Sequence, residues 1–455
     1  MLPRFVGIAP IARGGAVVLL ALFLAALVNA QPPKEPDKKD PDKKEPTKEI
    51  EWPKEINGRD LNAWLNEVND PDPVIREYAI RTIPNFGPPA QEDKIAKVLL
   101  KHFVDEKDPG VKLALFDSIG LLQFKNESLN QDALRILIIA VDNPVGPSAG
   151  VYRLHAIQTI AMFGAKGEGA ITALTGNAVR DPSYETRRNI ARTLGLVGFN
   201  ETTGPNMKAL TRLADTLSFD PSASVRMESL QALMRLGPPW AGVKKKDDKT
   251  SPPINTKDAA VIIKYMRQRV GDPKATPKPT PPLEKDKQVE IWARLVLMRF
   301  DPKEVNDENL DALAKYLTGA EPAVKVQALN AMLIMGPLAS KKLDDVLRVM
   351  DEPKAPYQQV MACVQVLAAM GGNAKPALPK LKALLEVKKK ELSTTELELA
   401  KKKDDPKLTA EKYVLADMVK TIEEVIKHID KSKPLSPSEL GNANADDPKK
   451  DPKKP

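Results

Sequence analysis

Small and apolar residues recur along this chain at three, seven and ten positions after a reference residue that is usually basic. After Arg76 these positions hold Ala79, Ile83 and Phe86, and Gly87 closes the stretch. At 100° per residue, the three offsets lie within about 60° of one another on a helical wheel. The pattern predicts a helix with one buried stripe, and glycine suits the left-handed residue that follows a helix C-terminus.

Eight stretches of the chain follow this rule. Besides Arg76, the reference residues are Lys112, Arg153, Arg187, Arg226, Glu290, Lys325 and Val360. Successive references are 34 to 41 residues apart, except for one interval of 64 residues between Arg226 and Glu290. A second amphipathic helix is predicted in most intervals, over residues 93–104, 129–141, 169–179, 206–217, 309–317, 338–350 and 376–387. Each unit of the repeat is therefore predicted to be a pair of helices.

One helix pair cannot cover its own apolar stripe, but stacked pairs share a core. The sequence therefore predicts an all-α fold, an α-solenoid or superhelix of stacked helix pairs over residues 57–390. Residues 60–68 are expected to form the first helix. Capping helices are expected within 391–432, one of them over 408–429.

The repeat resembles a known family. The segments "VIREYAIRTIPNFG", "SVRMESLQALMRLG" and "AVKVQALNAMLIMG", preceded by Asp-Pro or Glu-Pro, are similar to HEAT repeats, specifically the short bacterial repeats also found in PBS lyases. The resemblance covers about residues 57–390. It implies an armadillo-like superhelix whose second helices line the concave side. The family consists mostly of scaffolds and interaction modules.

The first thirty residues have the composition of a targeting segment. Arg4 and Arg13 supply positive charge, residues 16–28 are an unbroken apolar run, and "VNA" ends the segment. This arrangement is typical of a secretory signal peptide. The protein is therefore predicted to be exported, periplasmic or extracellular, with an uncleaved membrane anchor as the alternative.

Four other segments are rich in proline and charge. Residues 31–56 and 433–455 are predicted to be a disordered linker and tail, and loop insertions are predicted at about 238–255 and 271–287. A short amphipathic helix is expected between the two insertions, over residues 256–270.

One short motif raises the question of catalysis. Gly146-Pro147-Ser148-Ala149-Gly150 matches G-x-S-x-G, the turn that presents a hydrolase nucleophile between a strand and a helix. In the repeat register, residues 136–141 belong to a helix, and His155 follows Ser148 too closely to act as the distant base of a triad. We therefore interpret the motif as a loop, with Ser148 near the start of the next helix.

The chain has few side chains of the types used in catalysis or metal binding, which limits the classes of function that it can have. The chain has 3 His and 1 Cys and no H-E-x-x-H motif, so we predict no catalytic residue, no cofactor and no metal site. The net charge is +8, and the excess lysines collect at 244–246, 388–390 and 401–403. No aromatic residues interleave with these clusters, so nucleic acid is not an expected partner. Electrostatic association with the cell envelope is an alternative role for them.

Two rows of residues carry the predicted contacts. The first, at the reference position, borders the apolar stripe and is expected to be a structural ladder pairing with acids of neighbouring turns: Arg76, Lys112, Arg153, Arg187, Arg226 and Lys325. The second, five residues later, lies opposite the stripe and is the predicted partner-binding row: Arg81, Asp117, Gln158, Arg192, Gln231, Asn330 and Gln365. We call this second row the polar row. Leu295 stands at the equivalent position of the Glu290 unit.

These patterns favour a non-catalytic, exported and monomeric scaffold that binds a protein or peptide partner. A lyase-like HEAT protein or enzyme subunit is the first alternative, because similar repeats occur in such lyases. An envelope-associated structural protein, tethered through the Pro/Lys-rich tails, is the second.

Overall fold

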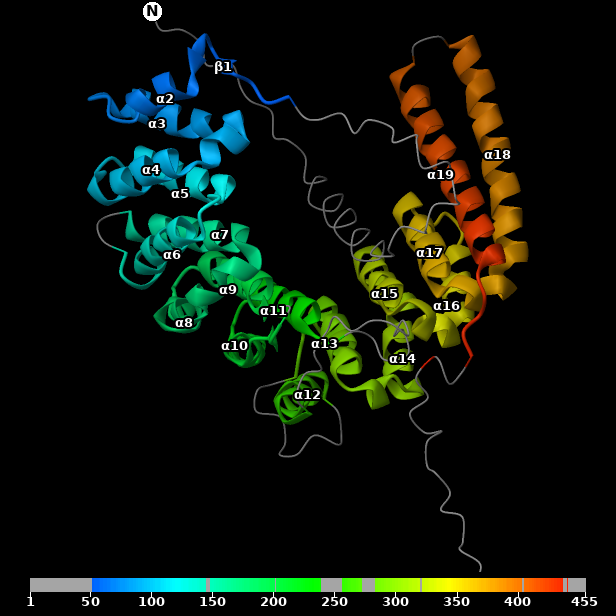
Figure 1. Cartoon of the computed structure of the whole chain (residues 1–455). Helices are drawn as coiled ribbons and strands as arrows, with labels where there is room; N and C mark the ends of the chain where they lie inside the picture. Colours follow the sequence, from blue (N-terminus) through cyan, green and yellow to red (C-terminus); the bar gives the residue numbers. More distant parts are fainter. Residues whose placement is uncertain are drawn as a thin grey trace, which may run out of the picture. The chain divides into compact units, whose positions relative to one another are not determined.

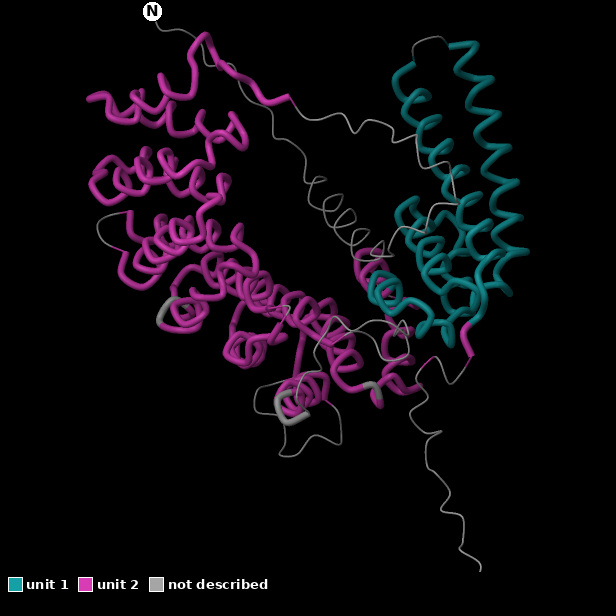
Figure 2. The backbone as a smooth tube through the Cα atoms, viewed as in Figure 1, with its two compact units in different colours: residues 1–49, 329–434 teal, residues 50–328, 435–455 magenta. Residues whose placement is uncertain are grey.

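The computed structural model describes residues 51–144, 148–200, 202–238, 256–271, 283–319, 321–402, 405–436 and 440. The chain divides into two compact units (Figure 2). Unit 2 contains Ile50–Ala328, and unit 1 contains Leu329–Pro434. The predicted signal peptide, residues 1–30, lies outside the described residues.

Unit 2 confirms the predicted all-α solenoid, because it is a stack of helix pairs arranged as two rows (Figure 1). The inner row is α3 (Pro73–Thr82), α5 (Pro109–Leu122), α7 (Ala149–Met162), α9 (Tyr184–Val197), α11 (Ala223–Leu236) and α13 (Lys287–Phe300). The outer row is α2 (Leu61–Glu67), α4 (Asp93–Asp105), α6 (Glu127–Asp142), α8 (Ile171–Thr175), α10 (Met207–Phe219), α12 (Thr256–Val270) and α14 (Asp307–Ala314). Each inner helix contacts the next, so the separate stripes join into a continuous core.

The long interval in the repeat contains a regular element. Helix α12 contacts both α10 and α13, which is the position of an outer helix. The predicted helix over 256–270 is therefore the outer partner of α13. The interval is long because loops flank a normal helix pair.

Helix α15 (Pro322–Met335), which carries the next repeat of the sequence, contains the boundary between the units. Unit 1 continues with α16 (Leu343–Met350), α17 (Tyr357–Met370), α18 (Leu378–Lys401) and α19 (Pro406–Lys431). Helix α19 packs along α18 and against α17. The predicted closing helix over 408–429 corresponds to α19.

The apolar stripe is buried in every repeat. The residues at offsets three, seven and ten are all buried, from Ala79, Ile83 and Phe86 in α3 and its extension to Cys363, Leu367 and Met370 in α17. The sulfur of Cys363 is thus a core atom. Burial of such side chains contributes about 1.5–3 kcal/mol each, which makes the stripe the main source of stability.

The starts of the inner helices follow from the acids before them. Asp108 accepts hydrogen bonds from the backbone N–H groups of Gly110 and Val111, and Pro109 occupies the first turn of α5. Asp72 caps α3 in the same way through Val74. Acid caps and first-turn prolines are both favourable where helical N–H groups lack partners.

Two features that the sequence analysis missed join the inner helices. At offset six, buried hydroxyl groups donate to backbone carbonyls of the preceding inner helix: Ser118 to Ile80 at 2.9 Å, Thr159 to Phe116 at 3.3 Å, and Thr193 to Ile157 at 3.2 Å. At offset eight, Gly195 lets α11 approach α9, because a Cβ there would lie 2.6 Å from the Cβ of Ala232.

The structure begins earlier than predicted. Residues 51–56, assigned above to the disordered linker, are part of unit 2. Strand β1 (Glu55–Ile56) pairs with β2 (Arg59–Asp60) around Asn57 and Gly58, which both have positive φ angles of 53° and 74°. An Asn-Gly pair favours this type of hairpin turn.

Other predicted boundaries also shift. The helix expected over 169–179 is interrupted: η3 (Gly164–Ala170) and η4 (Asn177–Arg180) are 3-10 turns on either side of the short α8. Glycines 164, 167, 169 and 176 explain this, because glycine is a poor helix former. The helix expected over 338–350 likewise begins as a 3-10 turn, η7 (Gly336–Lys342), before α16.

The C-terminal boundaries differ as well. Helix α18 continues through residue 390, where the solenoid was expected to end. Lys433 and Pro434, assigned to the tail, lie against Gly372, where a Cβ would be 2.3 Å from their backbone atoms. Residues 283–287, assigned to the second insertion, are described, and Glu284 among them is buried.

Among the described residues, one helical stretch, Pro322–Met350, is long and apolar enough to cross a membrane by length and composition. Half of its most apolar window is buried inside the structure. Its buried residues include the repeat positions Ala328, Met332 and Met335. The core stripe therefore explains its hydrophobicity.

Candidate partner-binding face

The polar row falls on inner helices. In unit 2, Arg81, Gln158 and Arg192 are exposed, while Asp117 and Gln231 are half-buried. Leu295 on α13 is fully buried, so the row in unit 2 ends at α11. In unit 1, Asn330 lies half-buried on α15 and Gln365 lies exposed on α17.

The charges at the first two positions of the row neutralise one another. Arg81 donates to Glu77 at 3.0 Å and to Asp117 at 2.9 Å. His155 on α7 lies 3.6 Å from the other oxygen of Asp117. The section of the row over α3, α5 and α7 is therefore a closed network with little unbalanced charge.

Arg192 has a different environment. No carboxylate of a described residue lies within 4.0 Å of its guanidinium. Arg188, one turn earlier on α9, is exposed and likewise lacks such a carboxylate within the described residues. The inner row thus changes from paired charge on α3 and α5 to open positive charge on α9.

Exposed apolar side chains accompany the polar row. Leu121 on α5 and Met162 on α7 both stand at offset nine and are 60% and 39% exposed. Tyr78 on α3 is 52% exposed. Exposed apolar side chains and hydrogen-bonding groups therefore occur together on these inner helices.

The ladder residues, by contrast, are occupied in holding the stack together. Arg187 donates from Nε and Nη2 to the two oxygens of Asp220, at 2.7 and 3.2 Å, and from Nη1 to the carbonyl of Asp181 at 2.8 Å. Arg226 makes the same set of contacts with Glu284 and with the carbonyls of Asp220 and Pro221.

In each bidentate pair between an arginine and a carboxylate, the acid stands at the same place in the repeat. It is six residues before the next reference residue, as shown by Arg76 with Glu106, Arg187 with Asp220 and Arg226 with Glu284. Each arginine therefore binds its own turn through carbonyls and the next turn through a carboxylate. Such two-pronged pairs fix relative orientation as well as distance.

Two of these carboxyl groups, Glu106 and Glu284, have lowered pKa values. Burial alone would raise the pKa of Glu106, but hydrogen bonds from Arg76 and from the backbone N–H groups of Asp108 and Lys107 outweigh it and lower the pKa to about 2. Glu284 accepts from both Arg226 and Arg269, and its pKa is also lowered.

Three ladder positions depart from this geometry. Arg153 binds Asp181 at 2.7 Å, but its Nε donates to the carbonyl of Val141, because the Asp-Pro turn is replaced before α7. Lys112 donates to the carbonyl of Glu106 at 3.2 Å, and its own next acceptor position is Pro147, outside the described residues. Lys325 lies half-buried on α15.

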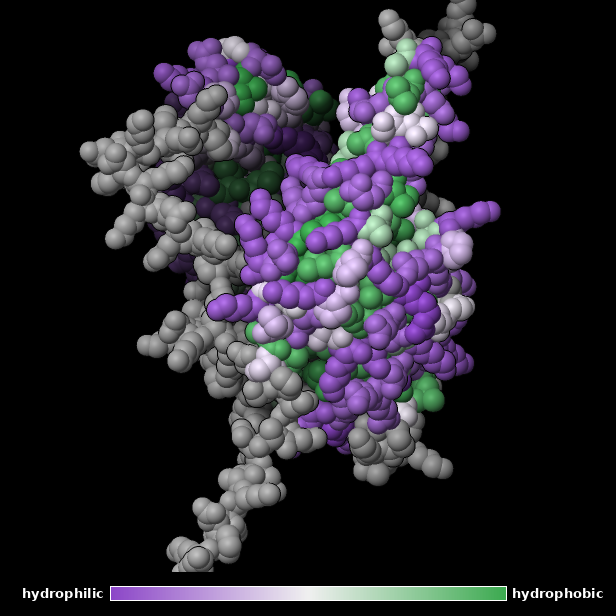
Figure 3. Space-filling model, turned by 90° about the vertical axis from the view of Figure 1, so that its right-hand side faces the viewer, coloured by the Kyte–Doolittle hydropathy of each residue, from purple (hydrophilic) through white to green (hydrophobic). Residues whose placement is uncertain are grey.

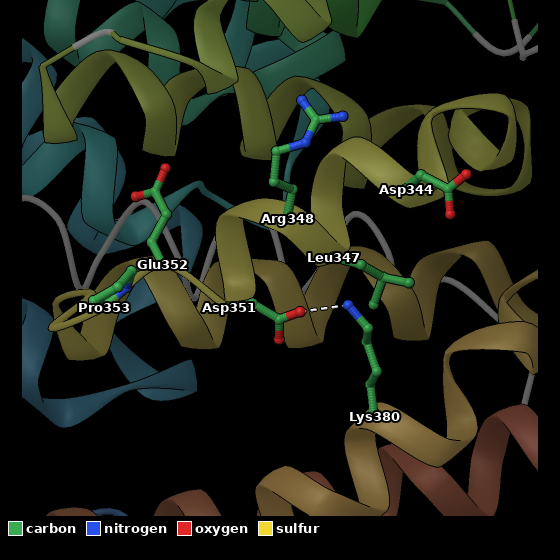
Figure 4. Close-up of a pocket in the computed structure, with 7 residues that line it drawn as sticks. All are labelled: Asp344, Leu347, Arg348, Asp351, Glu352, Pro353 and Lys380. Atoms are coloured by element: carbon green, nitrogen blue, oxygen red, sulfur yellow. Dashed lines mark hydrogen bonds and ion pairs between the residues drawn. The ribbon is translucent and has the colours of Figure 1, made fainter.

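Each unit also has a shallow cavity. In unit 1, a groove of about 530 Å³ lies beside α16 and α18 (Figure 4). Most of its charged side chains have partners: Lys380 pairs with Asp351, Arg348 with Asp345, and Glu352 accepts from Gln359. In unit 2, a cavity of about 460 Å³ is lined by Trp64, Tyr78 and five further residues of the first repeat.

Unit 1 also presents a mixed outer surface. Figure 3 turns the side of α18 toward the reader and shows hydrophobic residues between hydrophilic ones. Val387 and Leu397 of α18 are 52% and 63% exposed, and Tyr413 of α19 is 70% exposed. These residues are separated by charged side chains of the same helices.

The G-x-S-x-G motif lies where the repeat register places it. Residues 136–141 belong to α6, so the strand of a nucleophile turn is absent before Ser148 in the described part of this segment. Ser148 occupies the N-cap position of α7 but makes no side-chain capping hydrogen bond. Among the described residues, no group of three or more His, Cys, Asp or Glu side chains is placed to hold a metal ion.

The fold and this face define an all-α solenoid of stacked helix pairs. No protein-family model matches the chain, and no curated protein matches it in sequence. Solved structures that are similar include Kap121p bound to Ste12p, with a TM-score of 0.46 and 12% identity over 81% of this chain and 38% of that one.

The karyopherin Kap121p bound to the extreme C-terminus of the protein phosphatase Cdc14p gives a TM-score of 0.43 and 13% identity over 82% of this chain and 40% of that one. An engineered protein gives 0.36 and 13%, covering 81% and 88% of the two chains. This chain thus spans about two fifths of the length of the Kap121p chains that it matches.

Proposed function

We propose that this protein is a non-catalytic HEAT-type scaffold that binds a protein or peptide partner along the inner row of unit 2. The observation that carries the proposal is the exposed strip on α5 and α7, where Leu121 and Met162 lie open beside Asp117 and Gln158. Leu121 and Gln158 lie outside the apolar stripe, the hydroxyl contacts at offset six and the ladder, which hold the helices of the stack together. A long partner segment would make many modest contacts over successive inner helices.

Site-specific photo-crosslinking tests this proposal. A photoreactive residue replaces Gln158 on inner helix α7 in one variant and Arg135 on outer helix α6 in a control variant. We expect discrete crosslinked products from cell extract with the Gln158 variant and none with the Arg135 variant. Equal products from both positions, or none from Gln158, would contradict the proposal.

We further propose that the scaffold acts outside the cytoplasm. The basis is the basic, apolar and small-residue order of residues 1–30, which matches a signal peptide. Cell fractionation with N-terminal sequencing of the mature chain tests it. A chain that begins at Gln31 in the periplasmic or secreted fraction is expected, and an intact Met1 in the cytoplasmic fraction would overturn it.

A further inference from the structure

Three arginines on α9 have contrasting roles. Arg187 is held by four hydrogen bonds to Asp220 and to the Asp181 and Pro182 carbonyls. Arg188 and Arg192 are exposed, and no carboxylate of a described residue lies within 4.0 Å of either guanidinium. The stack therefore uses the first arginine and leaves the other two facing solvent.

Placing the two open arginines together works against helix stability. Arg188 and Arg192 are four residues apart, so they are neighbours on one face of α9. Like charges at this spacing destabilise a helix by a few tenths of a kcal/mol. The fold gains nothing from the pair, which points to a role toward another molecule.

The guanidinium of Arg235 on α11 lies close to α9 at Gly195. The close approach at Gly195 puts Nη1 of Arg235 3.1 Å from the position that a Cβ of Gly195 would occupy. Burial lowers the pKa of Arg235; Glu228, 3.6 Å away, opposes that shift, and the charge of Arg192 adds to it. The positive charges on α9 and α11 therefore act on one another.

The remaining groups on these helices leave this surface positive. Glu185 on α9 and Glu228 on α11 are the two carboxylates outside the ladder, and α7 contributes none. Arg235 is largely buried and pairs with Glu228 at 3.6 Å, so the exposed charges on α9 are the two guanidiniums of Arg188 and Arg192 and the single carboxylate of Glu185. The side-chain amides of Gln158 and Gln231 flank them on either side, on α7 and α11.

We propose that the α9–α11 section of the inner row binds an acidic peptide segment of a partner protein, with Arg188 and Arg192 pairing with its Asp or Glu side chains. This inference rests on the proposed function and adds the chemistry of the partner. Charge complementarity directs the acidic side chains to α9 and not to α3, because Arg81 already binds Glu77 and Asp117. Met162 on the neighbouring inner helix α7 is 39% exposed and offers an apolar contact to the same segment.

Two labelled probe peptides test the proposal by fluorescence anisotropy on the full chain. The peptides have the same length and the same leucines, and their remaining positions are all Glu in one and all Lys in the other. We expect the Glu peptide to bind more tightly, and its affinity to fall by about tenfold in the double variant Arg188→Glu/Arg192→Glu. Raising the salt concentration should weaken the same interaction.

The control variant is Arg135→Glu, an exposed arginine on outer helix α6, and it should leave binding of the Glu peptide unchanged. The Arg188→Gln/Arg192→Gln variant repeats the test without adding negative charge, and circular dichroism verifies the fold of each variant. Equal binding of both peptides would overturn the acidic preference and leave the proposed binding face intact. The proposal would also be overturned if the Glu peptide bound the Arg188→Glu/Arg192→Glu variant with the same affinity as the unmodified chain, or if it bound neither protein.

Discussion

The neighbouring arginines of α9 allow a strict test of the ladder. Arg187→Met and Arg188→Met remove the same guanidinium from adjacent positions of one helix. The first should destabilise unit 2, because Asp220 loses its bidentate partner and the carbonyls of Asp181 and Pro182 lose a donor. The second should leave stability nearly unchanged, because Arg188 pairs with no carboxylate among the described residues.

The size of the effect follows from burial. The side chains of Arg187 and Asp220 are only 14% and 6% exposed, so the pair resembles a buried ion pair more than a surface one. Removing one partner of a buried pair costs about 3–5 kcal/mol. Asp220 keeps a hydrogen bond from the backbone N–H of Ser222, which softens the loss. We therefore expect a loss of about 2–3 kcal/mol for Arg187→Met and less than about 0.5 kcal/mol for Arg188→Met.

Urea unfolding followed by circular dichroism at 222 nm measures the difference. A loss of 2–3 kcal/mol corresponds to a midpoint lower by about 1 M urea at a typical slope. Because repeat arrays can unfold in parts, hydrogen exchange of the backbone amides in α9 and α11 should be measured as well. We expect faster exchange in the Arg187→Met variant and unchanged exchange in the Arg188→Met variant. Equal midpoints for the two variants would refute the structural role of the ladder.

Three further predictions address the joints of the stack. Gly195→Ala should destabilise unit 2 by about 1–3 kcal/mol in thermal or urea unfolding, since its Cβ would lie 2.6 Å from that of Ala232; an unchanged midpoint would contradict this close approach. Ser118→Ala should cost about 1 kcal/mol by urea unfolding through the lost hydrogen bond to Ile80, and no measurable loss would argue against the hydroxyl contacts. Because the pKa of Glu106 is lowered on folding, its carboxylate contributes stability that is complete above about pH 4.5 and is lost as the pH falls toward 2. The Glu106→Gln variant should therefore lose less stability between these pH values than the unmodified chain. An unchanged dependence of stability on pH would contradict this role.

Much of this fold could be predicted because the same pattern of buried positions occurs in all eight repeats. The stripe positions had to be small or apolar, and all of them are buried. The interruption of the helix expected over 169–179 was harder to predict. The apolar residues of this segment keep the spacing of an amphipathic helix, although its glycines shorten the helix that forms. The β1–β2 hairpin could have been predicted from Asn57-Gly58, a strong turn signal inside a segment that otherwise has a linker's composition.

The proposed partner-binding face could be predicted from the sequence only as a row of positions. Periodicity places Arg81 and Arg192 at equivalent points of α3 and α9, but it carries no information on their partners. Arg81 is neutralised by Asp117, 36 residues away on the next inner helix, whereas Arg192 has no equivalent acid. Such differences depend on which residue stands opposite in the neighbouring repeat, and the structure is needed to match the two.

Position within the repeat also separates the constraints of folding from those of binding. A reference arginine and the acid six residues before the next reference form one unit, so a change in either leaves a buried charge without its partner. From α3 to α11, the residues at offset five are exposed or half-buried and lie outside the stripe and the ladder, although Arg81 and Asp117 pair with each other across two inner helices. Within this single chain, offset five holds Arg, Asp and Gln on successive inner helices, while the reference position from α3 to α11 is always Arg or Lys. If a partner binds at offset five as proposed, a solenoid built in this way could change what it binds one helix at a time, because most side chains at that offset lie outside the contacts that hold the helices together.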